Sequence, residues 1–185
     1  MQIHLPFEMP EIVARYKEKR FVVLPQLLTT QQAQELLATT TTIPSREVIC
    51  RNPHVSWLEQ KFFSGMPVFE LFRSAIPLVT DVLESETITK VTSWSSVYSL
   101  GKYINAHRDR LGTIQFLICL EAPPETNGGS LNLRGIDEVE TSICLQPGDG
   151  LLFEARRLLH WTTPLIATDA IPNPRRTVIV GRYFA

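Results

Sequence analysis

A histidine, an acidic residue and a distant second histidine constrain this chain more than any other feature. His107 and Asp109 are separated by one residue, and His160 follows His107 after fifty-three positions. Alternate side chains of a β-strand project from one face, so His107 and Asp109 point together while Arg108 points away. A second strand end that brings His160 to this face completes a metal site. The pattern therefore predicts a fold in which two distant strands lie side by side.

The chemistry of the three side chains narrows the kind of site. Two imidazoles and one carboxylate that leave coordination positions open are typical of non-haem Fe(II) centres. The letters His-Arg-Asp also open the catalytic loop of protein kinases, where an Asn stands five residues after the Asp. Here Ile114 occupies that position, and the chain has no early glycine-rich loop and no Asp-Phe-Gly. The kinase interpretation is therefore rejected.

The second half of the chain has the pattern of a β-protein. From Ile88 onward, short β-rich runs alternate with turn signals such as Pro123-Pro124 and Asn127-Gly128-Gly129. Many short strands without a long helix between them indicate a sandwich or a jelly roll. We predict one domain over residues 1–185, mainly β with N-terminal helices. A helical part over about 1–87 buttresses a double-stranded β-helix (jelly roll, cupin-like) over about 88–185.

Local signals place several elements in the first half. Phe21 to Leu24 is a short buried strand, and Thr29 with Gln32 forms a capping box that starts a helix. This helix is expected to run to about Ala38 and to end in the β-branched threonines 39–42. Residues 65–83 follow helical spacing, with a kink expected at Pro77. Residues 45–60 are interpreted as a loop over the mouth of the site.

Composition argues against several classes of partner. The net charge is −1, with 44% apolar and 20% charged residues, so neither nucleic acid nor an anionic membrane is the expected partner. The three cysteines, Cys50, Cys119 and Cys144, form no CxxC pair and indicate no disulfide framework. The N-terminus does not read as a secretory signal, and no apolar run reaches transmembrane length. A cytoplasmic location is expected.

The order of motifs along the chain resembles the Fe(II)/2-oxoglutarate-dependent dioxygenases, especially the compact prolyl-hydroxylase-like members. The resemblance covers about residues 90–184. Its elements are Tyr98, Gly101, His107, Asp109, the β-rich run 113–120, Gly128-Gly129, the turn 147–150, His160 and the run 175–184. It implies that His107, Asp109 and His160 hold Fe(II). It also implies that 2-oxoglutarate and O2 fill the remaining coordination positions.

The resemblance also requires a cation for the far carboxylate of 2-oxoglutarate, which a planar guanidinium suits best. Arg175 and Arg176 are adjacent in an expected strand, so only one can face inward. Arg176 has Arg182 six residues later on its own face, whereas Arg175 has Thr177. We favour Arg176 and leave Arg175 open. Several members place a tyrosine at the position of Tyr98, where it bonds 2-oxoglutarate, but a core tyrosine explains this residue equally well.

The implied activity is hydroxylation, with release of succinate and CO2. Halogenating members lack the carboxylate that Asp109 retains, and the nucleic-acid demethylases carry an Asn and a Thr that are missing between Arg176 and Arg182. A small metabolite, an amino acid and a peptide side chain all remain open as substrate, as does desaturation. The alternative is a catalytically silent jelly roll that binds a metal or ligand.

Three arginines lie outside this motif set: Arg108, Arg110 and Arg134. They are candidates to line the site and to bind an anionic small molecule. Surface arginines more often have no specific role, so the sequence leaves this interpretation open.

Overall fold

The computed structural model describes residues 3–42, 59–63, 67–84, 87–135 and 137–185. Its helices are α1 Met9–Lys19, α2 Thr30–Thr41, α3 Pro67–Ser74, α4 Ile76–Leu83 and the 3-10 turn η1 Glu125–Asn127. Its strands are β1 Phe21–Leu24, β2 Glu59–Phe63, β3 Lys90–Tyr98, β4 Ile114–Glu121, β5 Leu131–Arg134, β6 Glu140–Ile143, β7 Gly150–Phe153, β8 Leu159–Thr162 and β9 Arg176–Phe184. In this part of the chain, no helix has both the length and the apolar character needed to cross a membrane.

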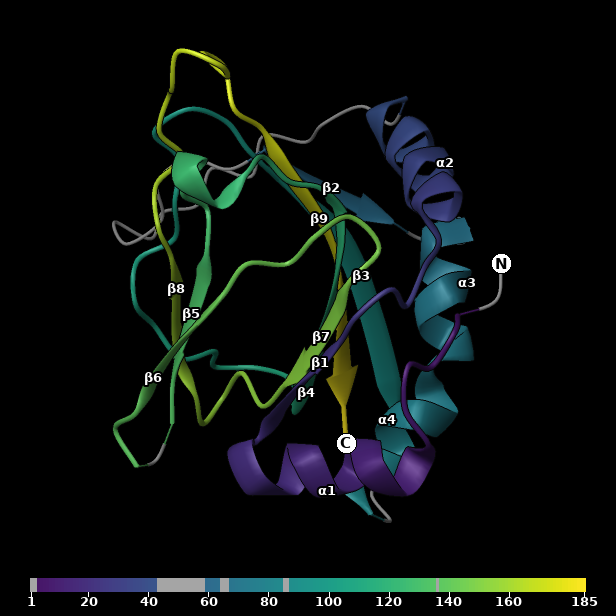
Figure 1. Ribbon diagram of the computed structural model, residues 1–185. Helices are drawn as coiled ribbons and strands as arrows, with labels where there is room; N and C mark the ends of the chain where they lie inside the picture. The colour runs from purple at the N-terminus through teal and green to yellow at the C-terminus, as the bar shows by residue number, and fades with distance from the viewer. Residues whose placement is uncertain (1–2, 43–58, 64–66, 85–86, 136) are drawn as a thin grey trace.

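Two antiparallel sheets form the body of the protein. The larger, six-stranded sheet has the order β1-β7-β4-β9-β3-β2, and the smaller, three-stranded sheet has the order β6-β5-β8. The helices cover one face of the larger sheet, and the smaller sheet lies on its other side (Figure 1). This arrangement is the predicted jelly roll with helical buttresses. Long connections place strands that are distant in the sequence next to each other, as β3 and β9 are in the larger sheet.

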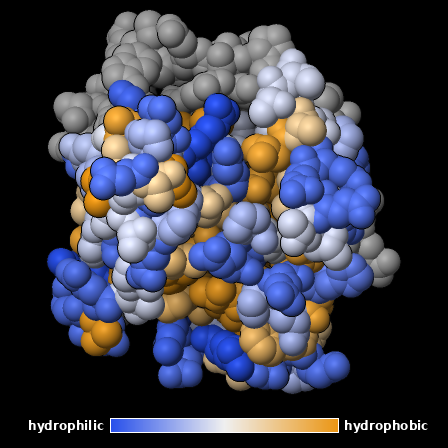
Figure 2. All heavy atoms as spheres, turned by 45° about the horizontal axis from the view of Figure 1, so that its top comes forward, coloured by the Kyte–Doolittle hydropathy of each residue, from blue (hydrophilic) through white to orange (hydrophobic). Residues whose placement is uncertain are grey.

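The strands of the larger sheet bury both faces. In β4, Phe116 and Ile118 pack in the core beneath the helices, whereas Leu117 and Cys119 pack in the core between the sheets. This two-sided burial explains why β4 is a continuous apolar run rather than an alternating one. On one outer face of the molecule, hydrophobic side chains lie in the middle, with hydrophilic ones on both sides (Figure 2).

The first helices confirm some local predictions and correct others. Thr29 caps α2 through the predicted capping box with Gln32. The threonines do not end this helix near Ala38, because α2 continues to Thr41. The hydroxyls of Thr39 and Thr41 donate to carbonyls three or four residues earlier, which satisfies them inside the helix.

Pro77 marks a boundary between helices rather than a kink within one. The predicted single helix over 65–83 is two helices, α3 and α4, which break at Ala75. Pro77 stands in the first turn of α4, where a missing backbone N–H costs nothing because no helical partner exists there. The predicted mouth loop over residues 45–60 lies almost wholly outside the described residues.

Candidate metal centre

His107, Asp109 and His160 meet between the two sheets. One ligand atom from each lies within 4.8 Å of the others. The segment around His107 joins the edge of β8 by two backbone hydrogen bonds between residues 107 and 160, at 3.0 and 2.9 Å. Two residues on, the Asp109 N–H donates to the carbonyl of Ala155 at 2.9 Å. Backbone pairing therefore holds all three side chains at one end of the jelly roll.

Both histidines are oriented by their own backbones. Nδ1 of His107 is bonded to the carbonyl of Asn105 at 2.8 Å, and Nδ1 of His160 to that of Leu158 at 3.0 Å. A carbonyl can only accept, so each Nδ1 carries the proton and each Nε2 keeps its lone pair. Histidines that ligate metals have this second contact, which fixes the tautomer. The two imidazoles thus turn their Nε2 atoms away from these carbonyls, with ring centres 4.2 Å apart.

The two oxygens of Asp109 have different environments. Oδ2 accepts hydrogen bonds from Nη2 of Arg182 at 2.7 Å and from the side-chain amide of Gln115. Oδ1 lies 3.6 Å from Nε2 of His107, on the side of the histidine pair. One oxygen is therefore held by the protein and the other faces the histidines, as a single-oxygen metal ligand requires. The sequence analysis missed Gln115, although a glutamine inside the apolar run of β4 was a visible signal.

Burial and neighbouring charge set the protonation of the triad. Burial, together with the neighbouring His107, lowers the pKa of His160 from 6.5 to about 4, so its imidazole is neutral at neutral pH. Burial also acts to lower the pKa of His107, but the hydrogen bond and charge of Asp109 raise it overall. Burial acts to raise the pKa of Asp109, but His107 and Arg182 lower it overall. The carboxylate is thus charged, and of the two histidines His107 is the one that protonates first as the pH falls.

Arg176 is a buried cation with no anionic partner in the described part of the chain. Its residue surface is 3% exposed, and its Nη2 has no hydrogen-bond partner among the described residues. Its guanidinium lies over the ring of Tyr98 at 5.2 Å. Burial raises the pKa of the Tyr98 phenol, and the Arg176 charge only partly opposes this. A buried guanidinium nitrogen without a hydrogen-bond acceptor is costly, and a carboxylate ligand would satisfy it.

The structure places Arg175 and Thr177 on the opposite face of the strand from Arg176. Arg175 is exposed, and its Nε lies 3.4 Å from Oε2 of Glu121. The Thr177 hydroxyl donates to the same oxygen at 2.8 Å. Both residues therefore contact Glu121: Arg175 is exposed, whereas Thr177 is buried on the opposite face of the strand from Arg176.

Arg182 lies on the same interior face of β9 as Arg176, as the spacing predicted, but near the opposite end of the strand. Six strand residues span about 20 Å, with Val178 and Val180 between the two arginines on this face. Arg182 contacts Asp109 and lies over the ring of Trp94 at 4.9 Å. The structure thus places Arg182 beside a metal ligand, too far along the strand to share one carboxylate with Arg176.

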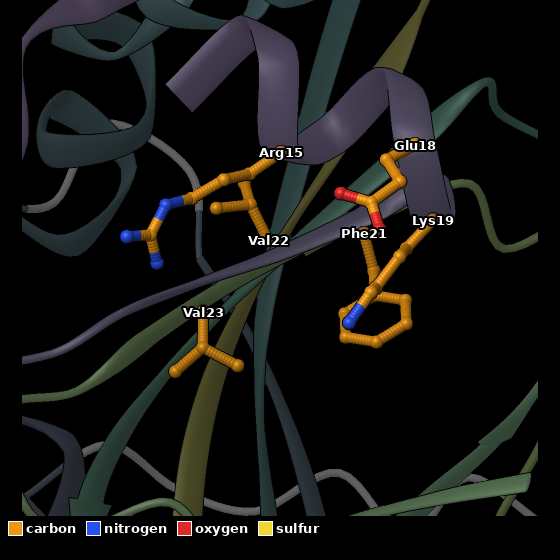
Figure 3. A pocket seen from close by; sticks show the side chains of 6 residues that line it. All are labelled: Arg15, Glu18, Lys19, Phe21, Val22 and Val23. Atoms are coloured by element: carbon orange, nitrogen blue, oxygen red, sulfur yellow. The ribbon is translucent and has the colours of Figure 1, made fainter. Parts of the chain in front are cut away.

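Two hollows border β1 on the same side of the molecule. The first, of ≈ 390 Å³, is lined by Arg15, Glu18, Lys19, Phe21, Val22 and Val23 (Figure 3). The second, of ≈ 410 Å³, lies between the α1–β1 turn, the β5–β6 hairpin and Leu158. Phe21 pairs with Phe153 across β1 and β7, and the Phe153 ring lies 5.1 Å from that of His160. The second hollow therefore adjoins the wall of the candidate metal centre.

Comparison with solved structures identifies the class of fold. No family model matches the sequence, and no curated protein matches it. A prolyl-4-hydroxylase from Pseudomonas putida superposes with a TM-score of 0.79 over 96% of this chain and 99% of its own, at 13% identity. A Trichoplax adhaerens prolyl hydroxylase, solved with a hypoxia inducible factor peptide fragment, has a TM-score of 0.74 over 95% and 88% of the two chains, at 17% identity.

A third structure is an alpha ketoglutarate dependent epimerase, SnoN, from nogalamycin biosynthesis. Its TM-score is 0.68 over 96% of this chain and 85% of its own, at 13% identity. The chain therefore has the jelly-roll fold of the Fe(II)/2-oxoglutarate oxygenases, and it carries a His-Asp-His cluster between its sheets. The fold prediction is confirmed, and at these identities the likeness concerns the fold.

Proposed function

We propose that this protein is an Fe(II)- and 2-oxoglutarate-dependent oxygenase that hydroxylates a small metabolite, an amino acid or a peptide side chain. The observation that carries the proposal is the presence, in one interior, of two imidazoles and a carboxylate together with the buried guanidinium of Arg176, whose Nη2 has no hydrogen-bond partner among the described residues. The donor set suits Fe(II), and the buried cation suits a dicarboxylic co-substrate.

Each residue has a distinct part in this activity. Nε2 of His107, Nε2 of His160 and Oδ1 of Asp109 hold the metal, while Arg182 and Gln115 fix the carboxylate through its other oxygen. Arg176 binds the far carboxylate of 2-oxoglutarate, and Tyr98 packs beside that guanidinium. When bound, Fe(II), 2-oxoglutarate and O2 supply the oxidising chemistry, which releases CO2 and succinate.

The structural neighbours support the class of chemistry more than the particular reaction. Two of them are prolyl hydroxylases, one of which was solved with a peptide, while another is an epimerase. Asp109 offers a third protein ligand, which favours hydroxylation or a related oxidation over halogenation. A peptide is one of the substrate classes that these neighbours suggest.

Succinate release tests the proposal. The wild type is first loaded with Fe(II) in the absence of oxygen. It is then exposed to air with 2-oxoglutarate and a panel of metabolites and peptides, and it should form succinate. His107→Ala and His160→Ala should form none. His4→Ala, which removes an exposed histidine elsewhere, is the matched control and should behave as the wild type. Metal retention without succinate formation for any substrate would instead indicate a silent binding protein.

A further inference from the structure

Basic side chains are concentrated on three chain segments beside the metal centre. They are Lys19 and Arg20, Arg108 and Arg110, and Arg156 and Arg157, which we name the basic rim. All are exposed except Arg20, which is partly exposed. The whole chain has a net charge of −1, so this cluster is a local feature and not a consequence of overall composition.

Hydrogen bonds hold the three segments side by side. The Glu154 N–H donates to the carbonyl of Arg20 at 3.0 Å. Nε of Arg108 donates to the carbonyl of Arg157 at 3.0 Å. Arg108 stands between the metal ligands His107 and Asp109, whose backbones also pair with the segment that carries Arg157. The basic rim therefore borders the metal centre directly.

Most of the charge on the basic rim is not neutralised. Glu154 lies 3.0 Å from Arg157 and 3.8 Å from Arg20. A second acidic residue, the exposed Glu18, precedes Lys19 and lines the same hollow as Lys19 and Arg20. Within the described part of the chain, Lys19, Arg108, Arg110 and Arg156 have no carboxylate partner. Arg134, which the sequence grouped with Arg108 and Arg110, pairs with Glu138 and Glu140 and is not part of the rim.

Apolar surface adjoins the cations. Leu111 follows Arg110 and is 65% exposed. The hollow of ≈ 410 Å³ is lined by Lys19, Arg20, Phe21 and Leu158, and also by the acidic Glu18 and Asp137. Leu158 supplies the carbonyl that orients His160. Basic and apolar groups thus lie together at the edge of the candidate active site.

We propose that the basic rim docks an acidic segment of a polypeptide substrate. The cations are spread over three segments and stay in solvent, so one small carboxylate would reach only a few of them. A peptide with several carboxylates fits their breadth, and apolar side chains of that peptide fit Leu111 and the hollow. The inference that this peptide is a substrate rests on the proposed oxygenase function. Binding of the peptide to the basic rim can be tested without enzyme turnover.

Two doubly substituted variants with the same charge change provide the test. Arg110→Gln with Arg156→Gln removes two exposed rim cations that form no ion pair with the other described side chains. Lys17→Gln with Arg73→Gln removes two exposed cations from the helical layer, where they pair with Glu84 and Glu70. The probes are short fluorescein-labelled peptides in which leucine alternates with glutamate, with lysine or with serine. Binding is followed by anisotropy on Co(II)-loaded protein at several salt concentrations.

The wild type should bind the glutamate peptide more tightly than the other two, and less tightly as salt increases. The rim variant should lose about three- to tenfold in affinity at low salt, and the control variant almost nothing. The proposal would be overturned if both variants lost the same affinity, or if the affinity did not depend on peptide charge. It would also be overturned if 2-oxoglutarate at stoichiometric levels displaced the peptide. Co(II) affinity, measured in parallel, should be unchanged in both variants, so failure of docking is distinguishable from failure of the metal centre.

Discussion

Arg182 and Asp109 are joined by a hydrogen bond of 2.7 Å between Nη2 and Oδ2, although seventy-three residues separate them in the chain. This contact fixes the rotamer of the carboxylate and leaves Oδ1 directed at the histidines. Arg182 would therefore act on a bound metal through Asp109 rather than by touching the metal. Because Gln115 occupies the same oxygen, the position of Asp109 is set from two strands at once.

Arg182→Gln should weaken metal binding. Groups that hold a metal ligand in place typically contribute about 10–100-fold to metal affinity. We expect a loss in that range for Co(II), measured by competition with a chromophoric chelator, and a smaller loss for Arg182→Lys. Arg73→Gln, a surface change of equal charge, should have no effect. Wild-type affinity in Arg182→Gln would show that the carboxylate is positioned without the arginine.

Gly112→Ala should disturb the contact between Arg182 and Asp109 by displacing the Arg182 side chain. Gly112 has φ +80°, and a Cβ there would lie 2.5 Å from Cγ of Arg182. Gly101 has φ +75° with nothing within 4 Å of its Cβ position, so Gly101→Ala is the matched control. Both variants should lose about 1–2 kcal/mol of stability from the left-handed backbone.

The two glycine variants should differ in metal affinity. Gly112→Ala should also weaken Co(II) binding, because Arg182 must move, while Gly101→Ala should bind Co(II) as the wild type does. Denaturant unfolding and the chelator competition measure the two effects separately. Equal Co(II) affinities in both variants would mean that Arg182 accommodates the new methyl group without leaving Asp109.

The metal-free protein should lose stability in mild acid through His160. Its pKa falls from 6.5 to about 4 on folding, so between these values the unfolded chain binds more protons than the folded one. This contribution is complete above about pH 6.5 and is lost as the pH falls towards 4, for a total of about 3 kcal/mol. The raised pKa of His107 acts in the opposite sense, since it favours the folded state at lower pH.

Urea unfolding of the chelator-treated wild type and of His160→Phe between pH 7 and pH 4 isolates this contribution. The stability of the variant should fall less steeply over this interval than that of the wild type. Parallel curves for the two proteins would contradict the assigned burial of a neutral imidazole.

The sequence predicted the parts of the fold that depend on local pattern. The capping box at Thr29 and the strand at Phe21 are such features, as are the closely spaced turn signals that indicated a jelly roll. The break at Ala75 was harder to foresee, because Pro77 suits both a kinked helix and the first turn of a new one. Helix spacing alone does not distinguish these outcomes.

Within the site, alternation predicted that Arg175 and Arg176 face opposite ways, and the structure shows this. Which residue Arg182 would contact could not be predicted, because the position of Asp109 relative to β9 depends on how distant strands pair. Gln115 was missed for the same reason. A polar residue in an apolar strand signals a buried partner, but the sequence does not name that partner.

The most direct test of the account is the affinity for 2-oxoglutarate in the absence of oxygen. Fe(II)-loaded wild type, Arg176→Gln and Arg175→Gln would be titrated with 2-oxoglutarate by calorimetry. Loss of a buried guanidinium–carboxylate pair costs about 2–5 kcal/mol, so Arg176→Gln should raise the Kd about thirtyfold or more. Arg175→Gln should raise it less than about fivefold, since that arginine is exposed and pairs with Glu121. Metal-independent binding, or equal small effects of the two substitutions, would contradict the assignment of this interior to Fe(II) and 2-oxoglutarate.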